Sequence, residues 1–117
     1  MRVLLVTMLV LALTACSGPP RSIPSPSGHY VLHVVNARDG EGVEMIHLFA
    51  EDVRTRTRVR LPCAWAARFN IAFAWDDHDR VWVDSSDVGV YAYELVNGAW
   101  TQLGAEEQRV LPEPRWK

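Results

Sequence analysis

Alternation of apolar and polar residues with a period of two, from His29 to Leu103, is the feature that most constrains the fold of this chain. A period of two places successive side chains on opposite faces of an extended strand, whereas a helix requires a period of about 3.6. β-branched and aromatic residues are frequent in the same segments, as is typical of strands. The sequence therefore predicts strands over residues 29–35, 43–49, 54–61, 69–75, 80–84, 88–95 and 100–103.

Two short polar segments predict tight connections between these strands. Residues 36–42 carry Asp39-Gly40 at their centre, and a hairpin is expected to join the strands on either side. Asn97-Gly98 is the strongest short hairpin signal in the chain, because a type I′ turn needs a positive φ at both central positions.

Proline and mixed charge predict where the strands stop. We expect Pro62 to end the strand 54–61, because proline cannot donate to a β-ladder, and residues 63–68 to form a short helical turn. Residues 104–117 contain two prolines and mixed charge. They are expected to be a loosely docked C-terminal tail.

Two stretches resemble blades of a β-propeller. Residues 25–32 are similar to the Ser-Pro-Asp-Gly opening of propeller repeats in exported proteins, and residues 71–103 read as strand, acidic turn, Val-Trp-Val strand, aromatic strand and Asn-Gly hairpin. A propeller needs at least four blades, and this chain has room for about two. The expected fold is therefore an all-β, small antiparallel sandwich or flattened barrel built from two blade-like meanders. The expected core includes Trp75, Trp82 and Trp100.

The N-terminal residues have the organisation of an export signal. Arg2 supplies a positive charge, residues 3–13 are apolar except for Thr7, and Leu13-Thr14-Ala15-Cys16 follows. These four residues resemble the lipobox of bacterial lipoproteins, whose cysteine becomes the acylated first residue of the mature protein. The resemblance implies a lipid anchor on Cys16, with several acyl chains to hold the protein at a bilayer.

A second resemblance concerns residues 75–89, which read Trp-Asp-Asp…Arg-Val-Trp-Val-x-Ser-Ser-Asp-x-Gly. They are similar to small, uncharacterised, β-rich bacterial lipoproteins, and this resemblance implies no activity. The expected organisation is a helical lipoprotein signal peptide over 1–15, lipidated Cys16 with a flexible Pro/Ser-rich tether over 16–28, a β domain over 29–103 and a tail over 104–117. The alternative for the N-terminus is an ordinary signal peptide with an incidental cysteine.

Charge and cysteine count narrow the chemistry. The net charge of −2 argues against nucleic acid as a partner. Two cysteines in an exported chain would ordinarily predict a disulfide, but an alkylated Cys16 leaves Cys63 as the free thiol of the mature chain. Cys63 lies in the apolar run 61–67, so it is expected to be a buried small apolar residue, with a reactive or intermolecularly paired thiol as the alternative.

An acidic segment is the first candidate site. Its five carboxylates lie within twelve residues: Asp76, Asp77, Asp79, Asp84 and Asp87. Oxygen-rich loops can hold calcium, and Asp76, Asp77 and Asp79 are the weak candidates for its ligands, but the spacing lacks the Asp-x-Asp-x-Asp-Gly rhythm. We expect instead a solvated turn whose carboxylates accept hydrogen bonds from nearby backbone amides. We therefore predict no metal site and no cofactor.

The same segment contains the ingredients of a nucleophilic site, since Ser85 and Ser86 follow His78. No Gly-x-Ser-x-Gly turn surrounds either serine. A zinc site is equally unsupported, because His29, His33 and His47 are spaced as strand residues without an accompanying cysteine pair. The sequence therefore predicts no catalytic residue and a protein that is not an enzyme.

Four alternating arginines are the second candidate site: Arg54, Arg56, Arg58 and Arg60. On one strand face their charges would repel each other unless carboxylates on neighbouring strands formed ion pairs with them. The expected carboxylates are Glu44, Glu51, Asp52 or Glu94. Protection of a sheet edge is a second structural role. As a binding surface, the four arginines would suit anionic headgroups or an acidic partner protein.

Together these features predict a lipid-anchored lipoprotein of the cell envelope that acts as a non-catalytic binding or structural module on a protein partner at the membrane surface. Ser17 after the cysteine favours the periplasmic face of the outer membrane, by analogy with enterobacterial sorting. The alternative is a small periplasmic hydrolase or metal-dependent enzyme that uses the segment Asp76–Asp87.

Overall fold

The computed structural model describes residues 21–116, so the expected signal peptide, Cys16 and the first part of the tether lie outside it. In this range eight strands form two four-stranded antiparallel sheets, each in sequential order. The first sheet contains β1 (Arg21–Pro24), β2 (Tyr30–Arg38), β3 (Glu44–Asp52) and β4 (Thr57–Ala66). The second contains β5 (Ile71–Trp75), β6 (Val81–Ser85), β7 (Gly89–Val96) and β8 (Ala99–Gln102).

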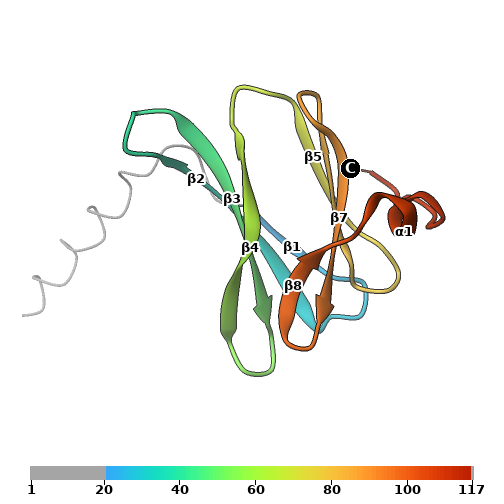
Figure 1. The fold of residues 1–117 in the computed structure, drawn as a ribbon. Coiled ribbons are helices and arrows are strands. Elements are labelled where there is room, and N and C mark those ends of the chain that lie inside the picture. Colours follow the sequence, from blue (N-terminus) through green and yellow to red (C-terminus); the bar gives the residue numbers. More distant parts are fainter. Residues whose placement is uncertain (1–20, 117) are drawn as a thin grey trace, which may run out of the picture.

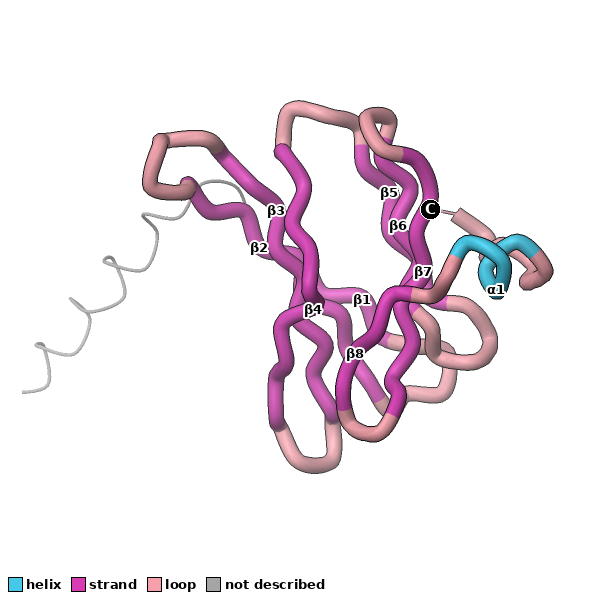
Figure 2. Tube along the Cα trace, viewed as in Figure 1, coloured by secondary structure: helices cyan, strands magenta, loops and turns pink. Residues whose placement is uncertain are grey.

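The two sheets pack face to face as a sandwich (Figure 1). Figure 2 shows them as two layers, with β4 beside β8 on one side. On the other side the Trp75 indole N–H donates to the Ile23 carbonyl over 2.8 Å, which joins β5 to β1. The buried residues between the layers are Leu32, Val34, Ile46, Leu48, Ala50, Leu61, Trp65, Phe73, Trp75, Val81, Val83, Tyr93 and Trp100. The predicted all-β domain of two meanders is confirmed.

The second sheet is covered on both faces. Trp75 and Trp100 lie in the main core as predicted, but Trp82 lies on the opposite face with Ala92 and Leu103. The C-terminal residues cover this second cluster through helix α1 (Ala105–Arg109) and through side chains that follow it. Within the described residues the tail therefore docks through a few half-buried side chains, while most of its residues are exposed. No helix among residues 21–116 is long and apolar enough to cross a membrane.

Gln108 of α1 completes the hydrogen bonding of β7. Its side-chain amide donates to the Val90 carbonyl over 2.9 Å, and its carbonyl accepts from the Ala92 amide over 3.0 Å. The pairing of β7 with β8 ends at Tyr93, so Gln108 takes the place of a strand beyond that point. The amide side chain thus supplies the donor and the acceptor that a neighbouring strand would supply.

Replacement of Gln108 by alanine is expected to lower the free energy of unfolding by about 1–3 kcal/mol, because it leaves two partly buried backbone groups of β7 unpaired. Urea unfolding followed by tryptophan fluorescence measures this change. Glu107→Ala is the matched control, since Glu107 is exposed on the same helix and should change stability by less than about 0.5 kcal/mol. Equal effects of the two substitutions would show that Gln108 does not hold the tail.

Two expected boundaries differ from the structure. The predicted tether extends to residue 28, but residues 21–24 form β1 and pair with β2. An edge strand tolerates proline where its nitrogen faces away from the sheet, and Pro24 occupies such a position. The expected helical turn over 63–68 is also wrong, because β4 continues through Pro62 to Ala66.

A bulge explains how β4 passes its proline. The register of β3 and β4 shifts between His47 and Phe49, so that Leu48 lies opposite residues 61–63. A bulge leaves its extra residues unpaired, which removes the need for an N–H at Pro62. The strand therefore bends at this proline and continues beyond it.

Candidate functional site

Asp76 organises the turn between β5 and β6. Its Oδ1 accepts hydrogen bonds from the backbone amides of His78 (2.9 Å) and Arg80 (3.0 Å). Its Oδ2 accepts from the Arg80 guanidinium (2.7 Å) and from the Trp82 indole (2.9 Å). The expectation that a carboxylate of this segment caps local backbone amides is confirmed at Asp76, and its four donors leave little capacity for a metal ion.

Burial and hydrogen bonding act in opposite directions on this carboxyl. Burial raises the pKa of Asp76, but the bonds from the Trp82 indole, from the Arg80 and His78 amides and from the Arg80 side chain together hold the pKa below its usual value. Asp76 is therefore ionised at neutral pH, and it forms an ion pair with Arg80.

Asp79 joins the turn between β5 and β6 to the turn between β1 and β2. The Ser27 hydroxyl donates to Asp79 Oδ2 over 2.6 Å, and the His29 ring lies 4.0 Å from the same oxygen. The other carboxylate oxygen of Asp79 is buried without a hydrogen-bond partner among the described residues. Asp79 therefore connects the two sheets, whereas Asp76 stabilises its own turn.

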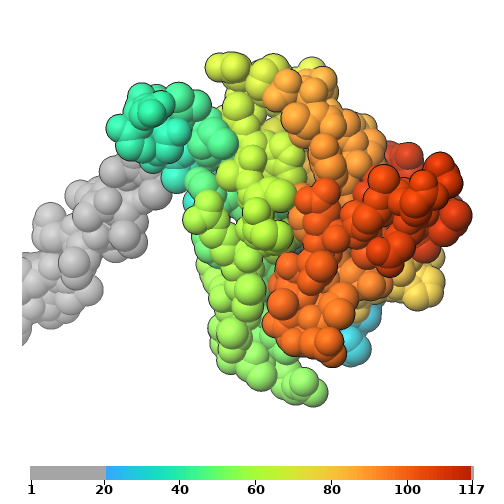
Figure 3. All heavy atoms as spheres, in the orientation of Figure 1, coloured from blue at the N-terminus to red at the C-terminus, as the bar shows by residue number. Residues whose placement is uncertain are grey.

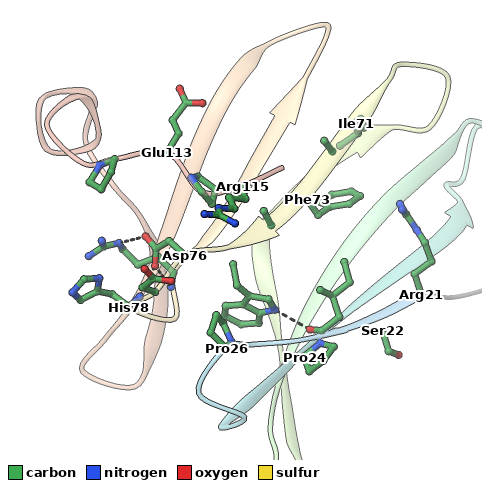
Figure 4. Close-up of a pocket in the computed structure, with 18 residues that line it drawn as sticks. Arg21, Ser22, Pro24, Pro26, Ile71, Phe73, Asp76, His78, Glu113 and Arg115 are labelled. Carbon is green, nitrogen blue, oxygen red and sulfur yellow. Dashed lines mark hydrogen bonds and ion pairs between the residues drawn. The ribbon is translucent and has the colours of Figure 1, made fainter. Parts of the chain in front are cut away.

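A groove of about 880 Å³ lies between the outer strands β1 and β5. Figure 4 shows Arg21 and Pro24 on one wall, Ile71 and Phe73 of β5 on the other, and the C-terminal tail at the rim. We call this hollow the edge groove; its lining residues are Arg21–Pro24, Pro26, Ile71–His78, Arg80 and Pro112–Arg115.

The edge groove collects only part of the residues that the hydrolase alternative requires. Asp77 and His78 line it, but Ser85 is buried and borders a different hollow beside Cys63 and Tyr93. The Ser85 hydroxyl accepts a hydrogen bond from the Asp87 amide over 3.2 Å, as expected of a local turn. Within residues 21–116 no group of three or more histidine, cysteine or acidic side chains is placed to hold a metal ion.

The four arginines do not share one strand face, and that prediction is wrong. Arg54 and Arg56 lie in the turn between β3 and β4, where Arg56 has a φ of +63°. Arg58 and Arg60 alternate on β4 after the strand begins at Thr57. All four side chains are exposed at the projecting end of this hairpin, which appears in green at the bottom of Figure 3. We call these four residues the arginine tip.

The arginines on β4 have partners on β3. Arg58 Nε lies 3.3 Å from Glu51 Oε1, so one of the carboxylates expected to answer the arginines does so. The same Glu51 oxygen is 2.7 Å from His33 Nε2. The His33 bond, with smaller contributions from Arg58, outweighs desolvation and lowers the pKa of Glu51.

Arg60 pairs with a histidine. Its guanidinium lies 2.8 Å from His47 Nδ1, to which it donates. Desolvation and the charge of Arg60 lower the pKa of His47, which keeps the ring neutral and able to accept this bond. Arg54 and Arg56, which make no ion pair with a described residue, are thus the freest cations of the arginine tip.

Cys63 is a free, half-buried thiol that packs against the main core. Its Sγ lies 2.8 Å from the Tyr93 hydroxyl. Burial of Tyr93, and then its bond to Cys63, raises the pKa of this phenol well above the usual range. The contact favours the structural role among the two that the sequence left open.

No sequence pattern predicts the edge groove. Its walls come from segments far apart in the chain, and one of them, β1, lies in a stretch whose prolines and serines predicted a tether. The clustered prolines of the rim, at 24, 26, 112 and 114, are the only sequence feature shared by its walls.

No similar protein was found when the chain was compared with protein-family models, curated proteins and solved structures.

Proposed function

We propose that this chain is a lipid-anchored lipoprotein of the cell envelope and acts there as a non-catalytic module that binds a protein partner at the membrane surface. The observation that carries the proposal is the sequence Leu13-Thr14-Ala15-Cys16 at the end of a short apolar run that follows a basic residue. Ser17 favours the periplasmic face of the outer membrane as its location.

The non-catalytic part of the proposal draws on the acidic segment. The carboxylate of Asp76 accepts hydrogen bonds from four internal donors, and that of Asp79 accepts one from the Ser27 hydroxyl. Asp77 and His78 lie in the edge groove apart from Ser85. This arrangement supports a structural role for the segment, because a nucleophilic site requires a serine within hydrogen-bond reach of its base.

The arginine tip supports the binding part of the proposal. Its guanidinium groups are exposed at the end of a projecting hairpin, where they can make bidentate contacts with carboxylates or phosphates. We place the acidic groups of the partner, or of lipid headgroups, at this tip.

Substitution of Cys16 by serine tests the anchor. We expect wild-type cells to incorporate an alkyne-palmitate label into the protein and to retain it in the membrane fraction, and the variant to lose both properties, because serine offers no thiol for thioether formation. Cys63→Ser is the matched control and should keep the label, since it removes the other cysteine of the chain. Label on Cys16→Ser, or its loss from Cys63→Ser, would contradict the assignment of the anchor.

A further inference from the structure

The exposed edge of β5 has a row of backbone groups without partners. The two hydrogen bonds that flank the β5–β6 ladder run from the Ser86 amide to the Asn70 carbonyl and from the Asp76 amide to the Arg80 carbonyl. Orientation alternates along an antiparallel ladder, so Ala72 and Ala74 also point toward β6. The N–H and C=O groups of the alternate residues, Ile71, Phe73 and Trp75, therefore point away from it.

Nothing in the described part of the chain pairs with these three residues through the backbone. β5 is the terminal strand of its sheet, and no hydrogen bond from residues 21–116 reaches the outward backbone groups of Ile71, Phe73 or Trp75. The unpaired N–H and C=O groups of an edge strand are a template for pairing with another strand, so this edge is a position that a further strand would complete.

The edge groove runs along this row. All five residues of β5 line it, which places the groove at the strand edge, since side chains from both faces of the sheet border it. Strand β1 on the opposite wall cannot pair fully with the outward backbone groups of β5, because Pro24 at an outward position of β1 has no N–H. Pro112 and Pro114 at the rim lack this donor as well.

We infer that the edge groove binds an extended peptide segment of a partner protein, which adds to the second sheet as a strand beside β5. This inference rests on the proposed role as a protein-binding module, and it adds a second contact site, apart from the arginine tip, and the form of the segment that binds there. Strand addition obtains its affinity from main-chain hydrogen bonds and its specificity from alternate side chains. Up to three donors and three acceptors of β5 are available for it.

The walls indicate which side chains the peptide carries. On the side of the sandwich core the groove is lined by Ile23, Phe73 and Trp75, so every second peptide residue would be apolar. On the other side β5 contributes only Ala72 and Ala74, which leaves room for larger residues near Arg115. None of the four residues of the arginine tip lines the groove, so the two surfaces are separate.

A second copy of this chain is a less suitable occupant than a single strand. The β5 edge lies between two rims, one formed by β1 and the other by residues 112–115. A second copy that presented its own β5 would carry the same two rims, and these would collide with the rims of the first copy. A lone extended segment has no such flanks and enters between the rims without this collision.

The test uses the full-length protein in detergent and a library of displayed random peptides. Peptides that bind are selected, and amide hydrogen exchange of the protein is measured by NMR with and without the best of them. We expect the amides of Ile71, Phe73 and Trp75 to exchange at least about tenfold more slowly in the complex. The amides of Ala72 and Ala74 serve as an internal reference, because they already point toward β6.

Two changes probe the main-chain bonds directly. Ile71→Pro removes one outward donor at the first residue of an edge strand, where proline is tolerated, and should weaken peptide binding about tenfold. Ile71→Val keeps the donor and should leave binding unchanged. Two N-methylated versions of the peptide are compared, each methylated at one of its two alternating sets of residues. The version methylated at the residues that pair with β5 should not bind, and the other should bind. This comparison does not depend on the folding of a protein variant.

Three results would overturn the inference. Selection of peptides that slow exchange at the arginine tip instead would remove the site but leave the proposed binding function standing. Failure to select any peptide would remove the peptide partner. Slow exchange of the three outward amides in the protein alone, with loss of protection on dilution, would show that a second copy occupies the edge.

Discussion

Replacement of Asp76 by alanine is expected to lower the free energy of unfolding by about 3–5 kcal/mol, the range found when one member of a buried ion pair is removed. The substitution leaves Arg80 without its 2.7 Å partner and the Trp82 indole without an acceptor, and it frees two backbone amides of the turn. Urea unfolding followed by tryptophan fluorescence measures the difference. A loss of less than about 1 kcal/mol would contradict the role given to this carboxylate.

Two neighbouring substitutions separate charge from geometry. Asp77→Ala changes an exposed carboxylate of the same turn and should alter stability by less than about 0.5 kcal/mol. Asp76→Asn keeps one oxygen acceptor but places an amide against a donor, so its loss should lie between those of the two alanine variants. If Asp76→Asn and Asp76→Ala were equally unstable, the retained oxygen would contribute nothing.

The acid dependence follows from the direction of the Asp76 pKa. The folded pKa is below the usual value of 3.8, so the stabilisation by this group is complete above that pH and is lost as the pH falls toward the folded pKa. Wild type should therefore lose stability more steeply below about pH 4 than Asp76→Ala does. Equal slopes for the two proteins in that range would show that the folded pKa is not lowered.

Strand positions were predictable because most turns of this chain carry a local signal. Asn97 and Gly98 both have a positive φ, as the hairpin motif requires, and the strands on either side form as expected. The error at residues 54–61 has a local cause as well. Alternation in the sequence continues through Arg54 and Arg56, but Arg56 takes a left-handed conformation in the turn, so the strand face cannot include it.

Features that depend on strand register could not be predicted from the sequence. The capping of backbone amides by Asp76 is a local pattern, but its bond to Trp82 requires the pairing of β5 with β6 to be known. Trp82 lies in the apolar run 81–83, so the sequence predicts its burial but not that it faces the tail instead of the main core. The edge groove depends on the packing of two sheets and on the position of the tail, neither of which has a sequence period.

Trp75 should be the most costly aromatic residue to remove, because it holds the open side of the sandwich. Its ring stacks on Tyr30 with centroids 6.2 Å apart and meets Trp100 at 6.0 Å, while its N–H bonds to the Ile23 carbonyl of β1. We expect Trp75→Ala to lower the free energy of unfolding by about 3–5 kcal/mol through loss of packing and formation of a cavity.

Conservative and peripheral substitutions identify the source of this loss. Trp75→Phe keeps an aromatic ring but cannot donate to Ile23, so it should cost less than alanine while still releasing β1, which would appear as faster exchange of the Ile23 amide. Trp116→Ala removes a partly buried tryptophan of the tail and should cost clearly less than Trp75→Ala. Because the Trp75 contact is the hydrogen bond that joins β1 to β5, unchanged exchange in β1 with Trp75→Phe would mean that packing alone holds the two sheets together at the edge groove.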